Sequence, residues 1–265
     1  MSAVLAKTLA CMIVAVAFLA GAYLLPRIPL DGGLALVAYG LTEMAGKYGA
    51  TVLVVLLTLV VVSRGGLSRR QRIRESVALA VVLTLTNGGM AYFNEHILKP
   101  LLAMPRPALL EMLEDGRIDL EQAEHFYNIG DKLERSRYLA DRLPPGTPGM
   151  HDVVRLHWIQ ETGHSFPSGH SLSALTIATF FLAWGLACLS GWRWRLMQLL
   201  PIWAVLAAYS RVFLRVHSPT DILVGGCEGV IVGLLGYALC RFLLYEPKRS
   251  QPQDSTAEKQ PSPAA

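Results

Sequence analysis

The sequence predicts an all-α, polytopic membrane protein with six transmembrane helices and an extramembrane helical cap between the third and the fourth. Its 265 residues are 52% hydrophobic and only 17% charged, with a mean hydropathy of +0.39. That is more apolar than an ordinary soluble domain. A helix of about 20 residues crosses the hydrocarbon core of a bilayer, and six apolar runs reach or approach this length. They lie at residues 8–25, 48–63, 76–97, 170–190, 196–213 and 222–244.

The first two runs each allow two interpretations. The first follows Lys7 and contains small residues at Ala20 and Ala22, as a signal peptide would. We expect a retained span, because the run is longer than the apolar region of about 7–15 residues in signal peptides. The second run is short by itself, so the stretch from Gly33 to Gly46 either extends this span or forms an interfacial helix.

The distribution of lysine and arginine predicts the orientation, because short cytoplasmic loops are enriched in these residues. One side of the membrane collects the basic residues of two short loops and the tail, and with them the N-terminus. These residues are Arg64, Arg69, Arg70, Arg72, Arg74, Arg193, Arg195, Arg241, Lys248, Arg249 and Lys259. The segment 99–169 and the turn 211–221 then share the external side, which is the periplasm in a Gram-negative cell.

We expect one membrane domain over residues 1–245 and a disordered cytoplasmic tail over 246–265, which is rich in Pro, Ser, Gln and charged residues. The segment 99–169 belongs to the membrane domain. It includes a predicted helix from Asp119, a capping residue, to Tyr127. Such a segment is positioned to form a cap or mouth over a site, and it has too little apolar sequence for a core of its own.

Composition argues against two other classes of function. The net charge of +4 is mild and the basic residues form no single stripe, so a nucleic-acid role is not expected. The four cysteines, Cys11, Cys188, Cys227 and Cys240, all lie within apolar spans and form no C-x-x-C pair. We therefore assign them neither a disulfide nor a metal.

Three short strings carry the residue types of a phosphoryl-transfer site. Cations suit the negative charge that spreads over a phosphoryl group in its transition state, and imidazole serves as nucleophile or as acid near neutral pH. Each string alone would fit a helix cap, a snorkelling lysine or a surface ion pair equally well, so their combination carries the prediction. The strings are Lys99-x6-Arg106-Pro107, Pro167-Ser168-Gly169-His170 and Ser210-Arg211-x5-His217-x3-Asp221.

The order and spacing of these strings resemble the three motifs of the type 2 phosphatidic acid phosphatase (PAP2) family, over roughly residues 75 to 240. The run from Arg155 to His170 further resembles the stretch before the second motif in the bacterial phosphatidylglycerophosphatase subgroup. This resemblance implies a membrane lipid phosphatase of the bacterial inner membrane.

The resemblance also implies roles for the motif residues. His217 is the nucleophile that forms a phosphohistidine, His170 is the general acid, and Asp221, one helical turn after His217, orients it. No metal and no cofactor are expected, since three cations take the charge-neutralising role that Mg²⁺ plays in kinases. The implied phosphate-binding residues are Lys99, Arg106, Ser168, Gly169 and Arg211.

Four further groups carry weaker expectations. Glu161 helps to select the substrate headgroup, relays a proton or forms a surface salt bridge. Glu228, in an apolar span, is expected to be a buried structural or proton-linked group. Arg215 either joins the third motif or faces lipid headgroups. The histidines between the motifs are expected to be loop residues, namely His125, His151, His157 and His164.

The predicted activity is hydrolysis of phosphomonoester or pyrophosphate groups on lipids such as phosphatidylglycerol phosphate, phosphatidic acid and undecaprenyl pyrophosphate. An alternative is a lipid phosphotransferase that passes phosphate from undecaprenyl pyrophosphate to an acceptor such as lipid A. A third hypothesis is a non-catalytic lipid carrier. The intact motifs argue against it. The partners implied are membrane lipids, with no obligate protein partner.

Overall fold

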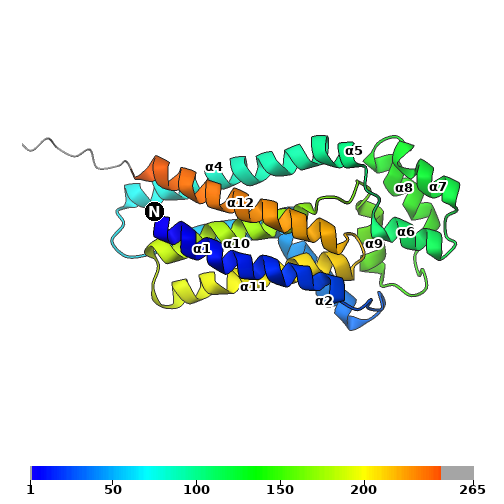
Figure 1. Ribbon diagram of the computed structural model, residues 1–265, viewed down its shortest axis with the longest axis horizontal. Coiled ribbons are helices and arrows are strands. Elements are labelled where there is room, and N and C mark those ends of the chain that lie inside the picture. The colour runs from blue at the N-terminus through cyan, green and yellow to red at the C-terminus, as the bar shows by residue number, and fades with distance from the viewer. Residues whose placement is uncertain (1, 246–265) are drawn as a thin grey trace, which may run out of the picture.

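The spanning helices lie side by side along the long axis of the molecule, and shorter helices gather at one end (Figure 1). The computed structural model describes residues 2–245, and it confirms the all-α, polytopic architecture. The expectation of a disordered tail at 246–265 lies outside the described residues. The long helices are α1 (Ser2–Ala20), α2 (Gly33–Ala45), α3 (Lys47–Val62), α4 (Arg69–Phe93), α10 (Gly169–Cys188), α11 (Gly191–Phe213) and α12 (Pro219–Leu244).

Five helical segments are long and apolar enough to span a membrane, and a bent pair brings the number to six among the described residues. The bent pair is α2 and α3, which meet at an angle of 62°. Gly46 separates the two helices in an extended conformation. A Cβ on Gly49 would collide with the Glu43 carbonyl, so the bend requires a glycine there. The stretch before the second run is therefore helical and leads into that run through a sharp bend.

α10 lies at the centre of the bundle, and most of its residues are buried. α12 packs against it through Gly225, Gly229 and Gly233, which repeat every four residues on one face. A Cβ on Gly229 would lie only 2.5 Å from the Leu172 carbonyl oxygen. Small residues permit this close approach of helix backbones, as is common between membrane helices. The approach also brings the first turn of α12 against the first turn of α10.

The third span is longer than its apolar run. α4 begins at a capping box formed by Ser68 and Gln71, and it continues through a π-helical turn (Asn94–Leu98) into α5 (Lys99–Leu102). The helix runs past Pro100 and ends at Leu102, where Ala103 adopts a left-handed φ of 47°. Lys99 and Arg106 are therefore not joined by a continuous helix.

The cap consists of α6 (Pro107–Glu114), α7 (Leu120–His125), η3 (Phe126–Asn128), α8 (Lys132–Arg142) and α9 (Asp152–Gln160). Asp119 caps α7 as predicted. Met112, Leu143 and Trp158 of the cap belong to a second buried apolar cluster. That cluster also includes residues outside the cap, such as Leu214 after α11. The cap is therefore packed, but it shares its core with the membrane helices.

The first and last described residues, Ser2 and Tyr245, and the basic loops lie away from the cap (Figure 1). α1 and its 3-10 extension η1 (Gly21–Leu24) pack into the bundle, with Met12 and Leu19 fully buried. At the end opposite the cap, Arg64 and Glu75 form an ion pair of 2.7 Å, and Tyr245 donates a hydrogen bond to Glu75. The three motifs therefore lie at the other end from most of the loop arginines (Figure 1).

Candidate active site

The three motifs converge where the cap meets the bundle. The first motif spans the start of α5 and of α6, the second lies at the start of α10, and the third joins α11 to α12. A backbone hydrogen bond of 3.0 Å from the Ser168 amide to the Asp221 carbonyl ties the second motif directly to the third. The close packing of α10 and α12 thus determines the relative position of these two motifs.

His217 and Asp221 form a buried pair. His217 Nδ1 lies 3.3 Å from Asp221 Oδ2, and both residues are at most 2% exposed. The same carboxylate oxygen accepts hydrogen bonds from Ser165 Oγ (2.5 Å) and from the Ser218 amide (2.8 Å). This arrangement orients the imidazole with Nδ1–H toward the carboxylate, which leaves Nε2 as the reactive nitrogen.

The surroundings keep the His217 imidazole neutral. Burial, reinforced by Arg106 and opposed by the hydrogen bond with Asp221, lowers the pKa of His217 to about 3. Nε2 lies 3.4 Å from Arg106 Nη1, close to the cations that would hold a phosphoryl group. A neutral imidazole with an unprotonated Nε2 is the form required for nucleophilic attack.

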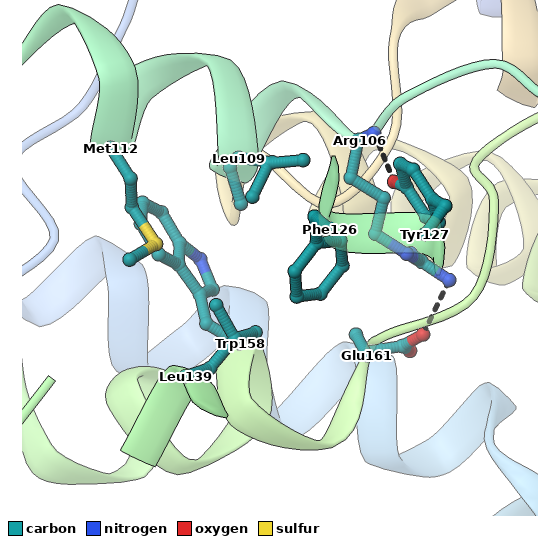
Figure 2. Close-up of a pocket in the computed structure, with 9 residues that line it drawn as sticks. Arg106, Leu109, Met112, Phe126, Tyr127, Leu139, Trp158 and Glu161 are labelled. Atoms are coloured by element: carbon teal, nitrogen blue, oxygen red, sulfur yellow. Dashed lines mark hydrogen bonds and ion pairs between the residues drawn. The ribbon is translucent and has the colours of Figure 1, made fainter. Parts of the chain in front are cut away.

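Two buried guanidinium groups converge on the carboxylate of Glu161. Arg106 Nη2 lies 2.8 Å from Glu161 Oε2, and Arg211 pairs with Oε1. Figure 2 shows Arg106 pointing to Glu161, with the Tyr127 hydroxyl beside the Arg106 backbone nitrogen. Although burial opposes ionisation, Arg106 and Arg211 hold the pKa of Glu161 well below its usual range. Glu161 is therefore an ionised member of the site.

Backbone carbonyls fix Arg106 in addition. Its Nε donates to the Gly163 carbonyl (2.8 Å) and its Nη1 to the Val216 carbonyl (2.9 Å). Gly163 precedes the second motif and Val216 lies within the third, so Arg106 connects all three motifs. Planar guanidinium groups held this way suit bidentate contact with the oxygens of a phosphate.

Lys99 is buried at the edge of the site and pairs with Glu95 one turn earlier (2.9 Å). Glu95 also pairs with Lys132 on α8, which links the cap to the third span. Lys99 is near enough to Arg106 and Glu161 to interact with them electrostatically. Its predicted contact with phosphate remains a prediction.

The second motif forms the N-terminus of α10. Ser168 is fully buried and caps this helix, because its Oγ accepts from the Ser171 amide (3.4 Å) and from the Ser171 hydroxyl (3.1 Å). Gly169 begins the helix with its amide unpaired within it. His170 is partly exposed and lies within electrostatic range of Arg211, Glu161 and His217. The structure thus brings both motif histidines to one place.

His157 is the site residue that sequence reasoning missed. We expected a loop histidine, but it lies on α9, is 6% exposed and has its Nε2 2.8 Å from Arg211 Nη1. Burial, reinforced by Arg211, lowers the pKa of His157 to about 3, so its neutral ring accepts the hydrogen bond from Arg211. The sequence offered one signal for this role: His157 lies four residues before Glu161, and residues with this spacing are neighbours on a helix.

Two further expectations have a structural answer. Glu228 accepts a hydrogen bond of 2.7 Å from the Asn94 amide, so the carboxylate pairs α12 with the π-helical turn. Arg215 pairs with Glu111 of the cap and donates to the Ile28 carbonyl. It joins the cap to the turn after α11 instead of facing lipid headgroups.

Known proteins are similar in sequence to this chain. Phosphatidylglycerophosphatase B of Escherichia coli is 30% identical over 149 residues, covering 55% of this chain and 52% of that protein. Its Haemophilus influenzae counterpart is 33% identical over 151 residues, covering 54% and 58%. Lipid A 4′-phosphatase of Bacteroides thetaiotaomicron is 32% identical over 111 residues, covering 40% and 46%.

The chain thus spans about half the length of these curated relatives. The sequence model of the PAP2 superfamily matches residues 76–244, which include all three motifs and most of the bundle. That range is more than half of the chain, and the three motifs that converge in the structure all lie within it. The chain belongs to the PAP2 superfamily.

Proposed function

We propose that this protein is an integral membrane lipid phosphatase that works through a phosphohistidine on His217. One observation carries the proposal: a buried, neutral imidazole is oriented by Asp221, and its Nε2 lies beside Arg106. Nucleophile, orienting carboxylate and anion-binding cation are the parts that attack on phosphorus requires.

In the first step, His217 Nε2 attacks phosphorus in line with the oxygen of the lipid. The N–P bond forms, the P–O bond to the lipid breaks, and His170 gives its proton to the departing oxygen. Asp221 stabilises the positive charge that develops on His217. Arg106, Arg211 and Lys99 balance the charge on the other phosphoryl oxygens, and one such donor contributes about a hundredfold or more in rate.

In the second step, water attacks the phosphohistidine while His170, now neutral, accepts its proton. Inorganic phosphate leaves and His217 returns to its starting form. If a lipid hydroxyl replaced water, the same site would act as a phosphotransferase, for example toward lipid A. A non-catalytic carrier would have no need of a histidine oriented in this way.

The proposed substrates are phosphatidylglycerol phosphate, phosphatidic acid and undecaprenyl pyrophosphate, and hydrolysis of the last would serve peptidoglycan synthesis. The relatives named above support a lipid phosphate as the substrate class. We place the site at the periplasmic face of the bacterial inner membrane, from the arginines at the opposite end. Neither a metal nor a cofactor takes part in the proposed steps, because the three cations bind the phosphoryl oxygens.

Glu161 gives the site a means of selecting substrates. Its carboxylate holds Arg106 and Arg211, so a bound phosphate must share these cations with it or displace it. Substrates that differ in phosphate charge would therefore respond differently to a Glu161→Gln substitution.

The deciding experiment measures phosphate release by detergent-purified protein from phosphatidylglycerol phosphate and from undecaprenyl pyrophosphate, with EDTA present. Wild type is compared with His217→Ala. Release that survives EDTA and disappears in the variant is expected, and the ratio of the two rates ranks the substrates. Absence of release from both lipids by folded wild type would contradict hydrolysis and lead to a test with a lipid acceptor.

A further inference from the structure

The imidazole of His157 contacts both the bundle and the third motif, although His157 belongs to none of the three motifs. The residue lies on α9 of the cap, and its ring meets the ring of Tyr39 on α2 edge-on, with 5.8 Å between the ring centroids and 80° between the planes. Its Nε2 lies 2.8 Å from Arg211 Nη1. His157 is 6% exposed and Arg211 is fully buried, so bulk water does not compete for this hydrogen bond.

The contacts of Arg211 leave part of its guanidinium group available to a ligand. An arginine side chain carries five N–H donors in one plane. One donor on Nη1 binds His157, and one on Nη2 pairs with Glu161. Nε is buried and has no hydrogen-bond partner among the described residues. The Nε–H group and the second N–H of each Nη are therefore donors that the oxygens of a phosphoryl group can take up.

The two acceptors of Arg211 differ in charge. Glu161 follows α9 directly, and its Oε1 lies 3.9 Å from His157 Nε2. Glu161 is ionised, whereas burial, reinforced by Arg211, keeps His157 neutral by lowering its pKa to about 3. A phosphate that binds Arg211 repels the carboxylate but not the neutral imidazole. The hydrogen bond from Arg211 to His157 is thus the one that a bound substrate leaves in place.

α9 also holds the backbone that carries Arg211. Trp158, the residue after His157, donates a 2.8 Å hydrogen bond from its indole nitrogen to the Leu214 carbonyl, at the end of α11. Two consecutive residues of α9 therefore contact both ends of the short segment from Arg211 to Leu214. A cation that is held at its side chain and along its backbone is preorganised, and preorganised donors stabilise developing charge at no cost of reorganisation.

We propose that His157 is a positioning residue for phosphoryl transfer, which keeps the Arg211 guanidinium oriented toward the phosphoryl group when the substrate draws Arg211 away from Glu161. The proposal rests on the proposed function, because it takes Arg211 as a cation that binds the phosphoryl oxygens. No step requires His157 to gain or lose a proton. What the role requires is a neutral hydrogen-bond acceptor on this turn of α9.

Three variants separate the acceptor from the bulk of the ring. His157→Gln keeps an acceptor, its side-chain oxygen, whereas His157→Phe keeps a ring against Tyr39 but has no acceptor. Val154→Ala is the control for the cap, because Val154 is a fully buried residue of the cap cluster on the same helix. Its truncation weakens the packing of α9 and changes no acceptor of Arg211. If His157→Phe does not give folded protein, His157→Leu takes its place.

The measurements are kcat and KM for dioleoyl phosphatidic acid in mixed micelles, together with the thermal unfolding midpoint of each variant. Removing a preorganised donor costs about a hundredfold or more in rate, and misorienting one should cost less, so His157→Phe should lower kcat about tenfold to a hundredfold. KM should change less than about threefold, because the orientation matters most where charge spreads in the transition state. His157→Gln should keep kcat within about threefold of wild type, since an amide oxygen accepts the same hydrogen bond. Val154→Ala should lower the unfolding midpoint and leave kcat unchanged.

The proposal is overturned if His157→Phe turns over the lipid as fast as wild type. It is also overturned if His157→Gln is as slow as His157→Phe, since the ring and not its acceptor would then matter. An equal loss of kcat in Val154→Ala would likewise overturn it, because weaker packing of the cap would then explain the result. Failure of the proposed function has a different signature, namely phosphate release by His217→Ala equal to that of wild type, whatever the His157 variants do.

Discussion

The side-chain amide of Asn94 donates a 2.7 Å hydrogen bond to Glu228, and this bond joins the π-helical turn of the third span to α12. Asn94 is 2% exposed, and its side-chain oxygen Oδ1 is buried without a hydrogen-bond partner among the described residues. A buried polar group whose partner is removed bears the full cost of desolvation. This bond therefore holds together two helices that carry the first and third motifs.

Glu228→Leu should destabilise the protein by about 1–3 kcal/mol, because it leaves the Asn94 amide without its acceptor. Glu228→Gln should cost less than about 1 kcal/mol, since the new side chain still offers a carbonyl oxygen. Thermal unfolding in detergent measures both. Equal stability of the Leu variant and wild type would show that the bond does not support the fold.

Asp221→Asn should abolish most activity while the protein stays folded. The amide can no longer accept Nδ1–H as a carboxylate does, so His217 loses its orientation and the stabilisation of its positive charge. In the serine protease triad the same change lowers kcat about 10⁴-fold, and we expect a loss of roughly 10²–10⁴-fold here. Steady-state phosphate release gives the value.

Ser165→Ala is the control for Asp221→Asn. It removes one hydrogen bond to Asp221 and leaves the charge, so its loss should be about tenfold or less. A larger loss for Ser165→Ala than for Asp221→Asn would contradict the role assigned to the carboxylate.

The protein should lose stability as the pH falls from 7.5 to 5. His157 and His217 have folded-state pKa values of about 3, against a usual value of 6.5. Below about pH 6.5 these two histidines become protonated in the unfolded chain but stay neutral in the folded chain, so acid favours unfolding. The contribution of these two histidines to the free energy of unfolding is fully present above about pH 6.5 and is lost progressively as the pH falls toward 3.

His157→Gln should reduce this acid sensitivity by roughly 1–2 kcal/mol between pH 7.5 and 5. Glutamine still accepts from Arg211 but takes up no proton. The measurement is the difference between unfolding midpoints at the two pH values within each variant, with exposed His125→Gln as control. Identical pH dependence in wild type and His157→Gln would refute the linkage.

Gly229→Ala should push α12 away from α10, because its Cβ would meet the Leu172 carbonyl oxygen at 2.5 Å. Overpacking of this kind costs about 1–3 kcal/mol. Activity should fall as well, since the packing of these helices places Asp221 next to Ser168. Gly89→Ala, in open space, should change neither quantity, and the unfolding midpoint and the rate test both.

The spans were predictable because the hydrocarbon core imposes both length and apolarity on any helix that crosses it. The boundaries moved where polar segments continue a helix, as in the first turn of α4 from Arg69. Asp119 was predictable because a capping box is local in sequence. The bend at Gly46 was not, since it depends on how α2 and α3 pack against the rest of the bundle.

By itself, the sequence determined the polytopic helical class, the motif residues and the family, because apolar length and motif spacing are properties of a linear chain. Tertiary structure alone decided that Glu161 pairs with both arginines, that His157 supports Arg211 and that the cap shares a core with the membrane helices. These contacts join residues from different elements, and their energies depend on burial and distance, which spacing along the chain does not encode.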